Sequence, residues 1–184
     1  MKKKITSILK KAKNPFYRIP KYFYYLLFIS FFLMLPIIQS KIAWGHDYPF
    51  HISNLVSVSE YLSITNLNLI YTKVFGGALV NGLGYGVGIF YPPMAYVVSG
   101  YAGYFLHKIG IAYPYVITII EFLVMFLSSI SMFGLAKKIF KNDGIAFLSS
   151  ISYISAPYFL SDIYVRCALN ELFVFALLPI VFTG

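Results

Sequence analysis

The sequence has a single cysteine and few charged residues. Cys167 alone excludes an intramolecular disulfide and any zinc site built from several cysteines. Charged side chains make up 11% of the 184 residues, whereas soluble domains usually carry about a quarter. By contrast, 59% of the residues are hydrophobic and 20% are aromatic. This composition excludes an ordinary soluble enzyme and also a disordered chain, which would need low hydrophobicity and many charges. It predicts an integral membrane protein.

Acidic residues are also scarce, with six against fifteen basic ones, for a net charge of +9. Eight of the basic residues lie within residues 1–21, and the rest of the chain is close to neutral. A basic cluster directly before an apolar run keeps an N-terminus in the cytoplasm and contacts anionic lipid headgroups. No basic patch lies on a later segment, so we expect a lipid bilayer as a partner and no nucleic acid.

The first apolar run, residues 22–40, would reach ~29 Å as a helix, which matches the hydrocarbon core of a bilayer. We interpret it as an uncleaved first span. A signal peptide is the competing interpretation, but no small-x-small cleavage site follows Ser40.

The later apolar stretches can be oriented by the cluster of Lys137, Lys138 and Lys141. If every stretch crosses the membrane, this cluster falls outside, against the tendency of lysine to stay cytoplasmic. If residues 88–106 do not cross, the cluster becomes cytoplasmic. We prefer the second topology, because that stretch carries Pro92 and Pro93 near its start together with glycines and tyrosines, which suit the outer interface.

The sequence therefore predicts an all-α, multi-pass protein of the cell membrane with a cytoplasmic N-terminus. The expected segments are a basic tail (1–21), a first span (22–40), a long extracytoplasmic loop (41–112) with amphipathic interfacial helices at about 50–64 and 90–107, a second span (113–136), a cytoplasmic turn (137–143), a third span (144–160), an outer loop (161–170) and the start of a further, truncated helix (171–184).

Polar residues that could carry chemistry gather in two places on the expected outer face. In the first, His46 and His51 flank Asp47. Asp47 could act as a base, as a metal ligand or as the cap of a helix start. The spacing matches none of the familiar metal motifs, so metal binding, including that of a divalent cation, is left open.

The second place contains Asp162, Arg166 and Glu171. On a helix, Asp162 and Arg166 would be four residues apart and could simply pair. Alternatively, Arg166 binds a phosphate through its planar donor fork, while Asp162 or Glu171 orients a substrate or a metal. Glu121 lies within the second expected span, where a charge is costly. It must therefore be protonated, face a cavity, be paired, or reach the outer interface.

The order of these motifs carries a resemblance. A basic N-terminus and one span precede the sequence GHDYPFH, and a glycine-rich passage at 82–86 runs into Phe90-Tyr91-Pro92-Pro93. The sequences AKKIF at 136–140 and APY at 156–158 follow, and then come Asp162, Tyr164, Arg166 and Glu171. This order resembles that of bacterial polytopic membrane proteins labelled "6-pyruvoyl-tetrahydropterin synthase-related" or YfhO-like. These proteins are similar to the GT-C class of membrane glycosyltransferases, and the label implies no pterin chemistry.

The resemblance implies a GT-C-like fold, with the first outer loop ending in an interfacial helix. It implies transfer of a sugar from a polyprenyl-phosphate carrier to a cell-surface glycan or lipid acceptor on the outer face. Asp47 matches the acidic residue of the first outer loop, which in the GT-C class is the catalytic base or a carboxylate that orients the acceptor, and it is the expected catalytic residue. The expected substrate-binding residues are His46, His51, Asp162, Arg166 and Glu171.

Family members generally have more spans than this chain. We therefore expect the chain to be the N-terminal portion of a longer protein, and to be inactive alone. The alternative function is that of a non-catalytic membrane protein, either a piece of a transporter or channel in which Glu121 faces a pathway, or a scaffold subunit. Convergence of Asp47 and Asp162 would favour the enzyme. A continuous polar path along Glu121 would favour transport.

Overall fold

The computed structural model describes residues 21–40, 45–64 and 92–183. Within these ranges every regular element is helical. The elements are α2 (Lys21–Ser40), α3 (Tyr48–Ile64), α5 (Met94–Lys108), α6 (Tyr113–Phe140), α7 (Asp143–Ile154), α8 (Pro157–Ser161), the π-helix η2 (Asp162–Arg166) and α9 (Leu169–Val181). The expected basic tail, up to residue 20, and the glycine-rich passage at 82–88 lie outside the described residues.

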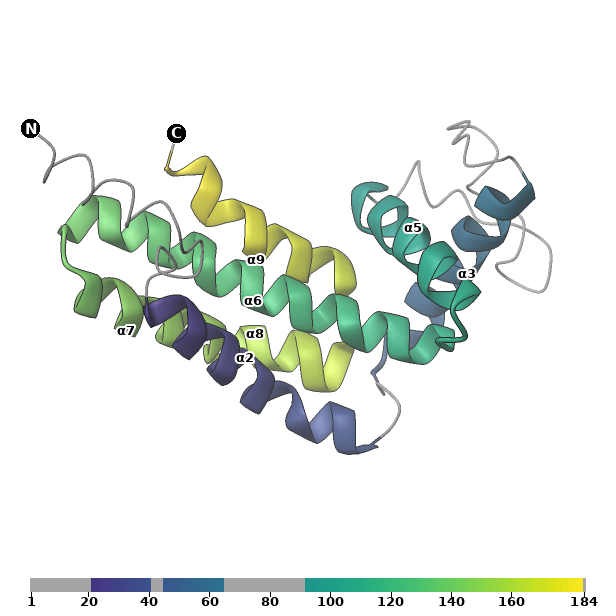
Figure 1. The fold of residues 1–184 in the computed structure, drawn as a ribbon, viewed down its shortest axis with the longest axis horizontal. Helices are drawn as coiled ribbons and strands as arrows, with labels where there is room; N and C mark the ends of the chain where they lie inside the picture. Colours follow the sequence, from purple (N-terminus) through teal and green to yellow (C-terminus); the bar gives the residue numbers. More distant parts are fainter. Residues whose placement is uncertain (1–20, 41–44, 65–91, 184) are drawn as a thin grey trace, which may run out of the picture.

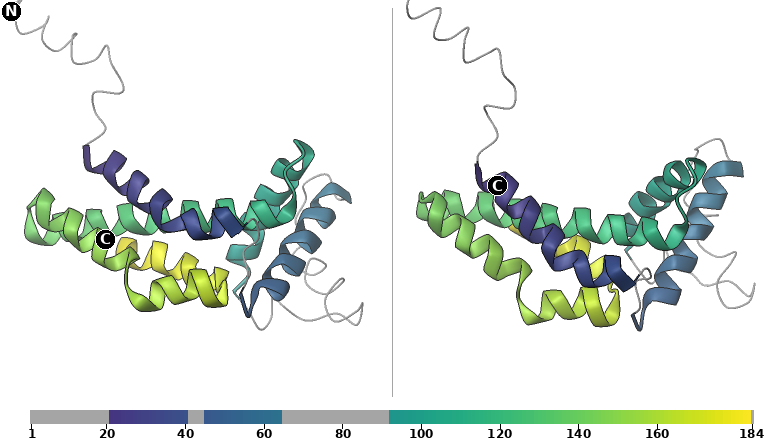
Figure 2. Two further views of the ribbon diagram at one scale, coloured as in Figure 1. Left: turned by 90° about the horizontal axis from the view of Figure 1, so that it is seen from below. Right: turned by 60° about the horizontal axis from the view of Figure 1, so that its bottom comes forward.

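The long helix α6 is the centre of the fold. Helices α2, α7 and α9 pack along it, and successive helices run back and forth along the bundle (Figure 1). Helices α3 and α5 pack against each other and project from one end, as both turned views in Figure 2 show. The bundle therefore has an α3 end, where α2 leads into α3, and a lysine end, which carries Lys137, Lys138 and Lys141.

The turn at the lysine end is set by local sequence. Lys141 adopts the left-handed conformation (φ 52°), and its N–H bonds back to the Lys137 carbonyl, which terminates α6. The side chain of Asn142 then accepts hydrogen bonds from the N–H groups of Gly144 and Ile145 at 2.8 and 3.1 Å. This is an N-cap that starts α7. Lys137 and Lys138 thus still belong to α6, so the connection is shorter than the expected turn of 137–143.

Among the described residues, α2 and α6 are each long and apolar enough to cross a membrane. Helix α7 qualifies only together with α8 and η2, from which it is bent by 43°. The bend interrupts the third span expected at 144–160. Its cause is Pro157, because a proline disfavours the helical conformation in the residue before it. Ala156 accordingly has ψ 137°, and the helix restarts at Pro157.

The segment expected as an outer loop, residues 161–170, is mostly helical. It forms η2 and the first residues of α9, which begins at Leu169. The helical run through the expected loop ends at Cys167, which has φ 57°. The polar residues of this segment therefore lie on regular helical backbone. The chain turns sharply at Cys167, directly after Arg166.

Helices α3 and α5 occupy the two stretches where the sequence predicts interfacial helices. Their contact is close, because Gly100 of α5 faces Val58 of α3. A Cβ added at Gly100 would lie 2.2 Å from Val58 Cγ1. Val58, Leu62 and Tyr96 form a small apolar core beneath this contact.

We expect Gly100→Ala to loosen the α3–α5 pair, because the added methyl overpacks a filled contact and costs ~1–3 kcal/mol. Thermal unfolding in detergent should show a lower midpoint. Gly134→Ala is the matched control, since a Cβ there meets nothing within 4 Å. The Gly100→Ala/Val58→Ala double variant should recover part of the loss. A midpoint for Gly100→Ala equal to that of Gly134→Ala would contradict this packing.

Candidate functional site

The two polar regions of the sequence meet through their backbones. The N–H of His46 donates to the Val165 carbonyl at 3.1 Å, and the N–H of Asp47 donates to the Arg166 carbonyl at 2.9 Å. Gly45 permits this approach, because a Cβ at that position would lie 2.6 Å from the carbonyl carbon and oxygen of Arg166. The segment before α3 is thereby docked on the end of η2.

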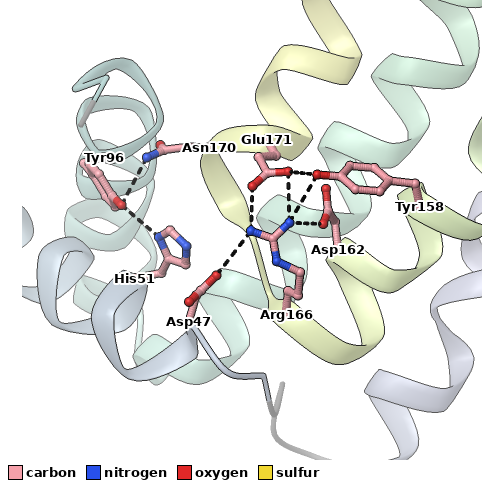
Figure 3. A network of polar contacts seen from close by, with 8 residues as sticks. All are labelled: Asp47, His51, Tyr96, Tyr158, Asp162, Arg166, Asn170 and Glu171. Carbon is pink, nitrogen blue, oxygen red and sulfur yellow. Dashed lines mark hydrogen bonds and ion pairs between the residues drawn. The ribbon is translucent and has the colours of Figure 1, made fainter. Parts of the chain in front are cut away.

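The guanidinium of Arg166 is the centre of the site (Figure 3). Its Nη1 donates to Asp162 Oδ1 at 2.9 Å and to Glu171 Oε2 at 3.0 Å. Its Nη2 donates to Glu171 Oε1 at 2.7 Å and lies 3.7 Å from Asp47 Oδ2. Glu171 is thus bound in the two-pronged geometry that makes arginine–carboxylate pairs strong. The contact between Asp162 and Arg166 that the spacing allows is present, within a larger cluster.

The three carboxylates of this cluster differ in access. The Asp162 side chain is completely buried, whereas those of Asp47 and Glu171 are 45% and 39% exposed, and that of Arg166 is 33% exposed. Asp162 is therefore a structural partner of Arg166. Asp47 has the longest contact with Arg166 and the most exposed carboxylate, so it is the most accessible of the three acids.

Tyr158 completes the cluster and is not among the residues predicted from the sequence. Its hydroxyl donates to Glu171 Oε2 at 2.6 Å and accepts from Arg166 Nη1 at 3.3 Å. The signal that could have identified it is the spacing of Tyr158, Asp162 and Arg166 at four-residue intervals, which lines side chains along one helix face.

A second polar group joins α3, α5 and the start of α9. The Tyr96 hydroxyl is 2.9 Å from His51 Nδ1 and accepts a hydrogen bond from Asn170 Nδ2 at 3.2 Å. The His51 and Tyr96 rings are also stacked, and both are buried. The sequence does not single out Tyr96 or Asn170. Asn170 precedes Glu171 directly, so this group and the Arg166 cluster share the first turn of α9.

Burial lowers the pKa of His51 from its ordinary value of 6.5 to about 4. The positive Arg166 acts in the same direction, and the carboxylates of Asp47 and Glu171 partly oppose it. His51 is therefore neutral at pH 7 and able to exchange a hydrogen bond with Tyr96. Its neighbour His46, in contrast, is exposed.

Glu121 is fully buried on α6, and among the described residues only one of its two carboxyl oxygens has a hydrogen-bond partner. Its Oε1 accepts a hydrogen bond from Cys167 Sγ at 3.2 Å. The Glu121 side chain thus contacts Cys167, the residue that follows Arg166.

Of the predicted site residues, Asp47, Asp162, Arg166 and Glu171 come together around one guanidinium. His51 joins a separate group nearby, and the His46 side chain remains at the surface. Among the described residues there is no group of three His, Cys, Asp or Glu side chains placed to hold a metal ion. The guanidinium itself lies between the carboxylates that could have served as ligands.

Neutral His51 predicts a pH dependence of stability. The unfolded chain takes up a proton as the pH falls through about 6.5, whereas the folded chain resists until about 4. His51 therefore favours the folded state above pH 6.5. This contribution, on the order of 3 kcal/mol, is lost between those values.

Unfolding in detergent from pH 7.5 to 4 should show a shallower loss of stability for His51→Gln than for the wild type. His46→Gln should keep the wild-type profile. Identical profiles for all three proteins would refute the neutral, buried state of His51.

Comparison of the chain with protein-family models, with curated proteins and with solved structures finds no match.

Proposed function

We propose that this chain is the N-terminal portion of a membrane glycosyltransferase-like protein, acting on a polyprenyl-phosphate-linked sugar at the outer face of the cell membrane. The observation that carries the proposal is the convergence of Asp47 and Asp162 on Arg166. Asp47 follows the candidate span α2, whereas Asp162 lies in η2, within the last part of the bent α7–η2 segment, so the two acids are far apart in the sequence. An active site of the proposed kind needs both on one side of the membrane, and their shared partner supports this.

The proposed topology makes the α3 end external and the lysine end cytoplasmic. Lys137, Lys138 and Lys141 lie at the opposite end of α6 from the Arg166 cluster. Lysines near span ends favour the cytoplasm. With α2, α6 and the bent α7–η2 segment as spans, the N-terminus is cytoplasmic. Helices α3 and α5 then lie at the outer surface without crossing it.

In the proposed reaction, Asp47 is the catalytic base. Its exposed carboxylate accepts the proton of an acceptor hydroxyl, whose oxygen forms a bond with the anomeric carbon. The bond between that carbon and the phosphate oxygen breaks, and the polyprenyl phosphate leaves with the electron pair. Inversion at the sugar follows, and the leaving phosphate needs no general acid.

Arg166 is proposed to stabilise the leaving phosphate, because a fixed cation is most effective where negative charge develops. Asp162, Glu171 and Tyr158 hold the guanidinium and are positioning residues. The phosphate can approach from the side of Asp47, where the 3.7 Å separation is the loosest contact of the cluster.

The topology can be tested by labelling single cysteines in intact cells with a membrane-impermeant maleimide, after Cys167→Ser. We expect His46→Cys and Phe105→Cys to be labelled from outside. We expect Ile139→Cys to react only after permeabilisation. All three positions are exposed on the surface of the protein, and labelling of each variant after permeabilisation is the control for access. External labelling of Ile139→Cys with His46→Cys protected would place the lysine end outside and the Arg166 cluster in the cytoplasm, and would overturn the proposed topology.

The reaction can be tested in membranes of the source cells, with substitutions made in the native gene. The donors are polyprenyl phosphates that carry tritiated glucose, mannose or galactose, and the readout is label in the glycan and lipid fractions. We expect Asp47→Asn to reduce transfer by ~10²–10⁴-fold, the typical share of a general base.

The matched control is Asp143→Asn, which removes an exposed carboxylate 3.1 Å from Lys137 at the lysine end. It should transfer at the wild-type rate. Transfer that is the same with and without the gene, or that is unaffected by Asp47→Asn, would overturn the proposal.

A further inference from the structure

Glu121 is the buried acid that the proposed reaction does not use. It lies on α6, one of the two candidate spans, and its side chain has no exposed surface. In the described part of the chain its Oε2 has no hydrogen-bond partner, and its Oε1 accepts only the weak S–H donor of Cys167. An acidic side chain in such surroundings is costly. An apolar residue would fill the space at lower cost, which indicates that the contact with Cys167 has a role.

Cys167 has an unusual backbone. It is completely buried and adopts the left-handed conformation at φ 57°, which residues other than glycine rarely occupy. Such conformations persist where surrounding contacts determine them. The turn at Cys167 allows the N–H of Ala168 to reach the Asp162 carbonyl at 2.9 Å. The turn also connects η2, which carries Arg166, to α9, which carries Glu171. Its conformation therefore sets the relative position of these two side chains.

The segment before α3 also holds this turn, through contacts at the surface of the protein. The N–H of Asp47 binds the Arg166 carbonyl, and Gly45 packs against Arg166 and the Cys167 Cβ. Glu121 contacts the side chain of Cys167 from α6, within the bundle. The peptide that carries Arg166 is therefore held between a surface segment and the central helix.

We propose that Glu121 is a positioning residue that acts through Cys167. Its hydrogen bond holds the left-handed turn, and the turn aims Arg166 at Asp47. The significance of this for catalysis rests on the proposed function, but the positioning itself is measurable without any sugar transfer.

The experiment measures the docking of the turn by disulfide formation. The reference protein is the full chain with His46→Cys, Val165→Cys and Cys167→Ser. The two introduced thiols lie on residues joined by a backbone hydrogen bond, and both positions are accessible. Serine retains a donor for Glu121. Copper phenanthroline with dissolved oxygen oxidises the pair in membranes, and the rate of bond formation is followed on non-reducing gels.

In this background we expect Glu121→Gln, which keeps an acceptor oxygen, to form the bond within twofold of the reference rate. Glu121→Leu, which removes the acceptor, should be about tenfold slower, because the donor at position 167 is left unsatisfied. Replacing Cys167→Ser by Cys167→Ala should slow the reaction similarly. Met125→Ala is the matched control. Met125 is a fully buried residue one turn further along α6, so its truncation weakens packing without touching the hydrogen bond.

Three results would overturn the proposal: no bond in the reference protein, a reference rate in both Glu121→Leu and Cys167→Ala, or equal slowing by Met125→Ala. Each variant is melted in detergent beforehand. If Glu121→Leu does not fold, the rate of the Cys167→Ala variant alone tests the proposal, because this variant differs from the reference protein only in the hydroxyl donor at position 167. Since the readout contains no sugar donor, failure of the glycosyltransferase proposal leaves this test intact.

Discussion

The pairing of one guanidinium with carboxylates from separate elements is the interaction on which the arrangement of the α3 end depends. Arg166 brings together the residue before α3, the start of η2 and the first turn of α9. Asp162 is fully buried, so removing its partner would leave an uncompensated buried carboxylate, which is strongly destabilising. The cluster therefore holds the α3–α5 pair on the bundle, and the function we propose uses the same contacts.

The bundle makes this cluster possible by supplying a rigid apolar frame. Helix α6 contacts α2, α5, α7 and α9, and the core side chains lie along its length. Large apolar residues cover much of the outside, among them Phe28 and Phe32 on α2 and Leu148 on α7. Such a surface is compatible with a membrane as the surrounding solvent. In that environment polar groups must find partners within the protein, and the buried side chains of His51, Asp162 and Glu121 form their hydrogen bonds at or near the α3 end.

The helices were predictable from the sequence because their signals are local. Apolar runs predicted helices at 22–40 and 113–136, where α2 and α6 lie, and the stretches around 50–64 and 90–107 predicted the pair now seen as α3 and α5. The break at Pro157 and the helical character of 161–170 were missed. The break is a local effect of Pro157 on the residue before it, and the surrounding apolar run obscures it. The second is a π-helix, which hydrophobic periodicity does not reveal.

By itself the sequence determined an all-helical, apolar chain and identified Arg166 and three of the four residues around its guanidinium, because unusual charges in an apolar chain are conspicuous. Only the tertiary structure decided that Asp47 and Asp162 share Arg166, that Tyr158 joins them, that Tyr96 and Asn170 bind around His51, and that Glu121 meets Cys167. The physical reason is that hydrophobicity and helix signals act within a few residues. The partners of a polar group, by contrast, are fixed by how distant helices pack.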